Sequence, residues 1–154
     1  NMSFGQVSEV FFMLLLPVFL KRYGLKTTLL VGMAAWAIRY LLFAYGDAGA
    51  GVWMLFSGII LHGICYDFFF VSGQIYTDYK AGEKIKSSAQ GLITLATYGV
   101  GMLVGFWLAG KIYDHYTDVA GAQDWKMIWT IPAGIAAVVM VLYAMVFKNE
   151  KINT

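Results

Sequence analysis

The sequence predicts an all-helical membrane protein with five membrane-spanning helices. Hydrophobic residues make up 60% of the 154 residues and charged residues only 13%, whereas soluble domains average about 25% charged residues. The apolar residues occur in long stretches, each close to the roughly 20 residues that one helical crossing requires. They do not form the short alternating segments of a transmembrane β-barrel. Five crossings and their loops use nearly the whole chain, so no soluble domain is expected.

The first two predicted helices cover residues 2–20 and 27–45. Between them, Lys21, Arg22 and Gly24 interrupt the apolar sequence, and charge followed by glycine is typical of a helix end. A cleaved signal peptide begins with basic residues, whereas here the basic residues follow the apolar stretch. We therefore expect the first helix to be retained in the membrane.

The other three predicted helices cover residues 52–76, 87–113 and 127–147. Glycine-rich, basic and acidic segments separate them, and a short charged tail follows the last one. An odd number of crossings that begins directly at Asn1 suggests that the chain is a piece of a larger protein, because transporters commonly combine repeated helix bundles.

Basic residues in the predicted loops indicate the orientation, because lysine and arginine are retained on the cytoplasmic side. One side collects Lys21, Arg22, Lys26, Lys80, Lys84, Lys86, Lys148 and Lys151. The loops of the other side carry Lys126 and several aspartates. The N-terminus is therefore predicted outside and the C-terminus in the cytoplasm.

Two carboxylates lie inside the apolar stretches, Glu9 in the first and Asp67 in the third. An ionised side chain near the bilayer centre costs about 2.5 to 3.5 kcal/mol on lenient scales, so its usual explanation is a place on a substrate or proton pathway. Arg39 is the only basic residue deep in the second predicted helix. It either extends to the headgroups or pairs with Glu9 or Asp67.

Several motifs occur in order along nearly the whole chain. They are Gln6-Val7-Ser8-Glu9, the basic turn of residues 17–26, the segment 35–47 with Trp36 and Arg39, Tyr66-Asp67-Phe68-Phe69, and Ser88-Ala89-Gln90-Gly91. Together they resemble the nucleoside:proton symporters of the major facilitator superfamily. The resemblance implies that the five helices are helices eight to twelve of a twelve-helix permease, which couples nucleoside uptake to inward proton flow.

The resemblance also implies the partners and the location. They are a nucleoside substrate, the proton as coupling ion with no other cofactor, the lipid bilayer of the cell (inner) membrane, and the missing N-terminal helices of the same transporter. No nucleic-acid partner is expected, because a net charge of +2 is too small and too dispersed for that role.

The substrate-binding residues that the resemblance implies are Gln6, Glu9, His62 and Tyr66. Gln6 and Glu9 share a helix face, and together they suit ribose hydroxyls and a base edge. Tyr66 offers a ring for stacking on a base. The family has an aromatic residue where this chain has His62, which suggests an altered pH dependence because histidine titrates near neutrality. The alternative for each residue is packing or hydrogen bonding between helices.

Asp67 resembles the proton-coupling aspartate of the family. A carboxyl group suits this work because protonation converts it from a hydrogen-bond acceptor into a donor. The alternative is a fixed salt bridge between Asp67 and Arg39, which gives Arg39 a structural, charge-pairing role.

Two other functions remain open from the sequence. A galactoside-type sugar symporter of the same superfamily also combines a carboxylate, an arginine and a histidine with an acid, although His62 lies five residues before Asp67 and not three. A membrane scaffold subunit is the non-transport alternative. No enzymatic activity is expected, because the sequence has no nucleophile–base pair, no clustered metal ligands and no phosphate-binding loop.

Overall fold

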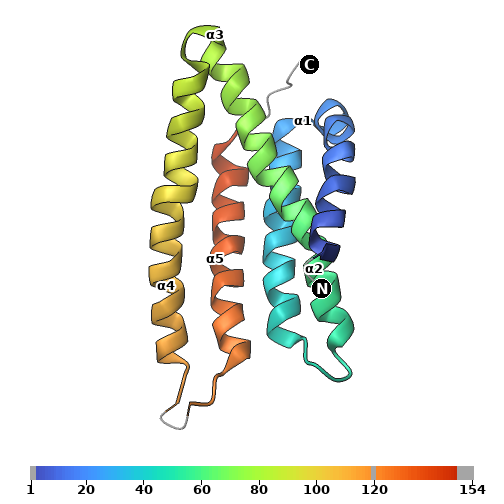
Figure 1. The fold of residues 1–154 in the computed structure, drawn as a ribbon, viewed down its shortest axis with the longest axis vertical. Coiled ribbons are helices and arrows are strands. Elements are labelled where there is room, and N and C mark those ends of the chain that lie inside the picture. Colours follow the sequence, from blue (N-terminus) through green and yellow to red (C-terminus); the bar gives the residue numbers. More distant parts are fainter. Residues whose placement is uncertain (1–2, 119–120, 149–154) are drawn as a thin grey trace.

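The computed structural model describes residues 3–118 and 121–148, and this part of the chain is built of helices joined by short loops (Figure 1). The prediction of an all-helical protein is confirmed for these residues. Two π-helical segments, η1 and η2, continue directly into the neighbouring α-helices. In chain order the elements are α1 (Ser3–Tyr45), α2 (Val52–Cys65), η1 (Tyr66–Val71), α3 (Ser72–Thr94), η2 (Leu95–Gly101), α4 (Met102–His115) and α5 (Trp125–Val146).

Three helical stretches in the described residues are long and apolar enough to cross a membrane: Gln6–Tyr45, Val52–His115 and Trp125–Val146. The sequence predicts loops at residues 21–26 and 77–86, but both segments are helical apart from one glycine each. Gly24 has φ 78° and Gly82 has φ 65°, a left-handed conformation that glycine adopts without steric cost. The chain therefore bends sharply inside α1 and α3 without leaving helical structure on either side (Figure 1).

Polar contacts join the two arms of α3 on either side of Gly82. Lys86 Nζ lies 3.3 Å from a carboxylate oxygen of Asp78. The side-chain amide of Gln90 donates to the same carboxylate and, at 2.8 Å, to the backbone carbonyl of Gln74. These contacts hold the second arm against the first.

The bends in α1 and α3 and the C-terminal end of α5 lie at one end of the molecule, and the loop 46–51 lies at the other (Figure 1). Lys26 Nζ donates to the carbonyl of Ala144 in the last turn of α5 at 2.7 Å, a favourable position for a cation. The basic residues predicted to share one side lie in these segments or, for Lys148, just after α5. Lys151 and residue 2 of the first predicted span lie outside the described residues.

The core forms where both arms of α1 meet η1. Leu16 and Leu20 of the first arm and Leu25 and Leu29 of the second are buried together with Phe68 of η1. Phe19 packs on Phe68 with ring centroids 4.8 Å apart. Burying these side chains is the main favourable term in this packing.

Two glycines let the helix backbones approach each other closely. A Cβ atom on Gly63 of α2 would lie 2.7 Å from the backbone nitrogen of Glu9, and one on Gly32 of α1 would lie 3.0 Å from the backbone of Phe68. Neither position has room for a side chain. Gly63 thereby sets the distance between Glu9 and α2, and Gly32 sets the distance between α1 and η1.

We expect Gly63→Ala to destabilise the full-length protein by about 1 to 3 kcal/mol, the usual cost of overpacking. Its methyl group would meet backbone atoms of Ser8 and Glu9, which cannot move aside by a rotamer change. The measurement is the thermal unfolding midpoint in detergent. Gly73→Ala is the matched control, since a Cβ there has nothing within 4 Å. Equal midpoints for the two variants would contradict the close approach.

Candidate functional site

A polar cluster forms between α1 and α2 inside the apolar bundle. His62 of α2 lies between two side chains of α1, with Nε2 3.0 Å from Glu9 Oε1 and Nδ1 2.8 Å from Arg39 Nη1. Glu9 comes from the first arm of α1 and Arg39 from the second. The side chains of His62 and Glu9 are 38% and 29% exposed, so both are partly accessible to a ligand.

The cluster is balanced in charge, because the Glu9 carboxylate and the Arg39 guanidinium are joined through one imidazole. Such pairing offsets the cost of removing the two charges from water. The guanidinium of Arg39 also lies over the ring of Phe43, at 5.3 Å from its centroid, a favourable cation–π arrangement. Arg39 is therefore held by contacts within the bundle.

Asp67 lies outside this cluster. Its side chain is 0% exposed, and within the described residues neither carboxylate oxygen has a hydrogen-bond partner. The pairing of Arg39 with Asp67 or directly with Glu9 that the sequence left open is not formed in this part of the chain, where Arg39 contacts His62. An ionised carboxylate without a partner in such a place costs several kcal/mol, so this geometry suits a protonated side chain.

An aromatic row continues from the cluster along η1. The rings of His62 and Tyr66 are 6.2 Å apart and those of Tyr66 and Phe70 5.4 Å apart. Tyr98 of η2 stacks on Phe70 at 5.6 Å and shares a hydrogen bond of 2.9 Å with the Tyr66 hydroxyl. Sequence reasoning missed Phe70 and Tyr98, since no local signal links Tyr66 to a tyrosine 32 positions later.

The hydrogen bond between Tyr66 and Tyr98 joins the two π-helical segments. Short π-helical turns inside α-helices are frequent at functional sites. The sequence-based placement of Tyr66 and Asp67 assumed α-helical spacing throughout, whereas both residues belong to η1. Here Tyr66 turns toward Tyr98 and His62, and Asp67 is buried in the bundle.

Gln6, like Asp67, is a predicted site residue that lies outside the cluster of Glu9, His62 and Arg39. It is exposed on α1, one turn before Glu9. No hydrogen bond links it to Glu9, His62 or Arg39 in the described part of the chain. Its side chain lies on a surface open to a ligand or to another part of the protein.

The chain matches the family model described as "Nucleoside H+ symporter" over residues 1–152. It belongs to the nucleoside H+ symporter family. Three similar proteins of Escherichia coli (strain K12) support this placement. The putative nucleoside transporter YegT is 44% identical and covers 97% of this chain, the xanthosine permease is 40% identical and covers 96%, and the nucleoside permease NupG is 36% identical and covers 99%.

The fold of this family member agrees with a solved relative. A crystal structure of the nucleoside transporter NupG superposes with a TM-score of 0.87 at 37% identity and covers 97% of this chain. The chain spans 37% of that structure, and 35% to 37% of the length of the three curated relatives. The transporter fold is therefore shown for this portion.

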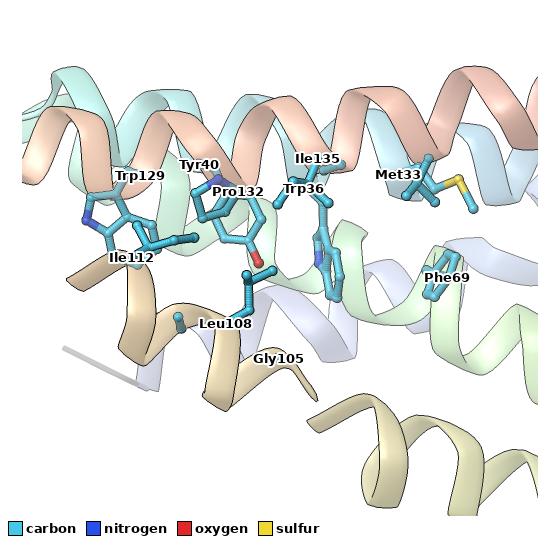
Figure 2. A pocket seen from close by; sticks show the side chains of 13 residues that line it. Met33, Trp36, Tyr40, Phe69, Gly105, Leu108, Ile112, Trp129, Pro132 and Ile135 are labelled. Carbon is cyan, nitrogen blue, oxygen red and sulfur yellow. The ribbon is translucent and has the colours of Figure 1, made fainter. Parts of the chain in front are cut away.

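A cavity of about 380 Å³ lies between α1, η1, α4 and α5 of this symporter-family chain. Figure 2 shows Trp36, Tyr40, Leu108, Phe69 and Trp129 around it. Its lining is almost entirely apolar, whereas a small-molecule site needs convergent polar groups that fix the ligand's orientation. Arg39 and Tyr40 are adjacent on α1 and therefore about 100° apart. The polar cluster and this cavity thus lie on different faces of one helix.

Removing the Tyr98 hydroxyl tests the link between the two π-helical segments of this family member. We expect Tyr98→Phe to lower the stability of the full-length protein by about 0.5 to 1.5 kcal/mol, the net value of one hydrogen bond, because the stacked ring remains. In a Tyr66→Phe background the same change should lower the stability little further, because the hydrogen bond is already lost. The measurement is a double-mutant cycle of unfolding midpoints, with Tyr79→Phe as control because Tyr79 is 51% exposed. Additive effects would contradict the hydrogen bond.

Proposed function

We propose that this chain is the C-terminal part of a permease that couples nucleoside uptake to inward proton flow. The observation that carries the proposal is the polar cluster of Glu9, His62 and Arg39 beside the buried, unpaired Asp67, on helices of membrane-spanning length. The family description and the names of the relatives support it. The proposed role is transport and not enzymatic catalysis, with the proton as coupling ion and no other cofactor.

We also propose that the three long helical stretches cross the membrane five times, as helices eight to twelve of a twelve-helix transporter. The approximate boundaries are 2–20, 27–45, 52–76, 87–113 and 127–147. The bends at Gly24 and Gly82 support two crossings within each of the first two stretches. The basic residues at the end that holds both bends support a cytoplasmic location for that end, with the first residues of the chain outside.

The nucleoside is proposed to bind against Gln6, Glu9, His62 and Tyr66. The Glu9 carboxylate accepts hydrogen bonds from ribose hydroxyls, and the exposed Gln6 both donates to and accepts from a base edge. The ring of Tyr66 stacks on the base, a contact worth about 1 to 3 kcal/mol per base in proteins that bind single-stranded nucleic acids. The missing N-terminal helices supply the opposite wall, as in transporters that bind substrate between two bundles.

Asp67 is proposed to carry the coupled proton. Its buried carboxyl group is most stable when neutral, because no described residue compensates a negative charge there. In the outward-facing state it takes a proton from the outside. Rearrangement of the helices then opens a path for water on the cytoplasmic side. Water solvates the carboxylate there and stabilises its charged form, so the proton leaves.

The test is uptake of labelled uridine by the full-length protein in energised membrane vesicles, with and without a protonophore. Adenosine and lactose are the competitors. We expect uptake that the protonophore abolishes and that adenosine blocks. Competition by lactose alone would favour the sugar symporter. No uptake, with the protein verified in the membrane, would favour the scaffold role.

A further inference from the structure

We propose that Arg39 is a positioning residue. It holds His62 neutral, with its proton on Nε2, so that His62 donates a hydrogen bond toward Glu9 and takes no part in proton coupling. The inference rests on the proposed function for its meaning in transport, but the protonation state itself does not depend on which substrate is carried. It assigns a role to the position at which this chain departs from the aromatic residue implied by the family resemblance.

The hydrogen-bond donors of Arg39 determine which nitrogen of His62 carries the proton. A guanidinium group has five N–H donors, no acceptor, and a charge that it keeps in proteins. Arg39 Nη1 lies 2.8 Å from His62 Nδ1, so the hydrogen bond forms only if Nδ1 carries no proton. A neutral imidazole then has its proton on Nε2. Glu9 Oε1 lies 3.0 Å from that nitrogen and accepts it.

Protonation of His62 would disrupt this arrangement. A proton on Nδ1 would point at the N–H of Arg39, and two positive groups would be in contact at 2.8 Å. The helical arms packed against His62 supply three charged or titratable groups that contact it: Glu9 from the first arm of α1, Arg39 from the second, and Tyr66 from η1. Glu9 favours an imidazolium and Arg39 opposes it. The direct contact between Arg39 and Nδ1 decides in favour of the neutral ring.

A neutral His62 leaves substrate binding and proton transfer to different residues of the site. The Nε2–H of His62 faces the carboxylate of Glu9. A substrate hydroxyl that replaces the direct hydrogen bond between them can accept from His62 and donate to Glu9. Asp67 is buried without a partner, and it remains the group that gains and loses the proton. His62 is therefore a binding residue whose donor direction Arg39 fixes.

The protonation state is directly measurable by ¹⁵N NMR of the full-length protein labelled at histidine, in lipid. At pH 7 we expect His62 to show a proton-bearing Nε2 and an unprotonated Nδ1, with the signals identified by their loss in His62→Gln. His115, exposed at the end of α4, provides a reference ring away from the cluster. In Arg39→Met we expect the midpoint for His62 protonation to move to higher pH, because Glu9 then acts on the ring without an opposing cation.

Arg39→Lys is the matched variant, since it keeps the charge and a donor and should retain the neutral Nε2–H ring. An imidazolium at pH 7, a proton on Nδ1, or an unchanged midpoint in Arg39→Met would overturn the proposal. If Arg39→Met does not fold, the pH titration of His62 in the unmodified protein and in Arg39→Lys still shows whether the ring is neutral at pH 7. None of these NMR measurements requires transport, so they remain informative even if the protein does not transport nucleosides.

A transport measurement tests the second half of the proposal. In vesicles, His62→Gln should raise the KM for uridine by about 2- to 12-fold, the range for one hydrogen bond between neutral groups. Accumulation should remain sensitive to the protonophore, and the pH dependence should remain that of the unmodified protein. Loss of proton-driven accumulation in His62→Gln, with binding retained, would make His62 a proton carrier and overturn the proposal.

Discussion

Asp67→Asn is expected to abolish proton-driven accumulation of nucleosides while leaving the folded protein at least as stable. Asparagine has nearly the shape of a protonated aspartate but cannot release a proton. The buried carboxyl group has no hydrogen-bond partner among the described residues, so the substitution breaks no bond there. It also removes a group whose ionised form would cost several kcal/mol in this position.

The measurement is uridine uptake by the full-length protein in vesicles with an imposed proton gradient. Concentrative uptake should vanish in Asp67→Asn, whereas exchange of internal for external uridine should persist, because exchange requires no net proton release. The thermal unfolding midpoint provides the stability control. Unimpaired accumulation in this variant would remove Asp67 from the mechanism. Loss of exchange together with a lower midpoint would show that Asp67 has a structural role.

Glu9→Gln is expected to weaken substrate binding strongly without uncoupling the proton. The amide oxygen of glutamine still accepts the hydrogen bond from His62, but the negative charge that balances Arg39 is lost. A hydrogen bond to a charged group contributes about 1.5 to 3 kcal/mol, which corresponds to a KM about 10 to 150 times higher. A larger effect is expected for Glu9→Ala, which leaves the His62 donor without its acceptor.

The KM and the maximal rate are measured separately in the same vesicle assay. Glu83→Gln is the matched control, because Glu83 is an exposed carboxylate near the bend in α3 and lies outside the cluster. We expect its KM to be unchanged. A normal KM in Glu9→Gln would exclude Glu9 from the substrate site. A normal KM with lost proton coupling would transfer the proton-carrying role from Asp67 to Glu9.

The helical class and the chemistry of the buried charges could be predicted from the sequence. Long apolar stretches have few structural solutions in a bilayer, since every backbone polar group must be satisfied internally. Glu9, Arg39 and Asp67 stand out for the same reason, because charges are costly there. The interruptions predicted at residues 21–26 and 77–86 coincide with sharp bends, but each bend is made by one glycine and the flanking residues stay helical.

The partners within the site could not be predicted from the sequence. Arg39 had two carboxylates as candidate partners, and the structure instead places it on His62. That choice depends on where the second arm of α1 lies relative to α2, which the bend at Gly24 and the close approach at Gly63 decide. Tyr98 likewise reaches Tyr66 only because α3 turns back at Gly82.

The sequence by itself therefore determined that this is a helical membrane protein, that carboxylates lie within its apolar stretches, and that its ordered motifs are those of one transporter family. Composition and local pattern suffice for these conclusions because bilayer solvation acts on each residue separately. Only the tertiary structure decided that Glu9, His62 and Arg39 form one charge-balanced cluster while Asp67 stays unpaired. Such pairing depends on distances of a few ångströms between helices, and those distances are set by backbone bends and by side-chain packing far apart in the sequence.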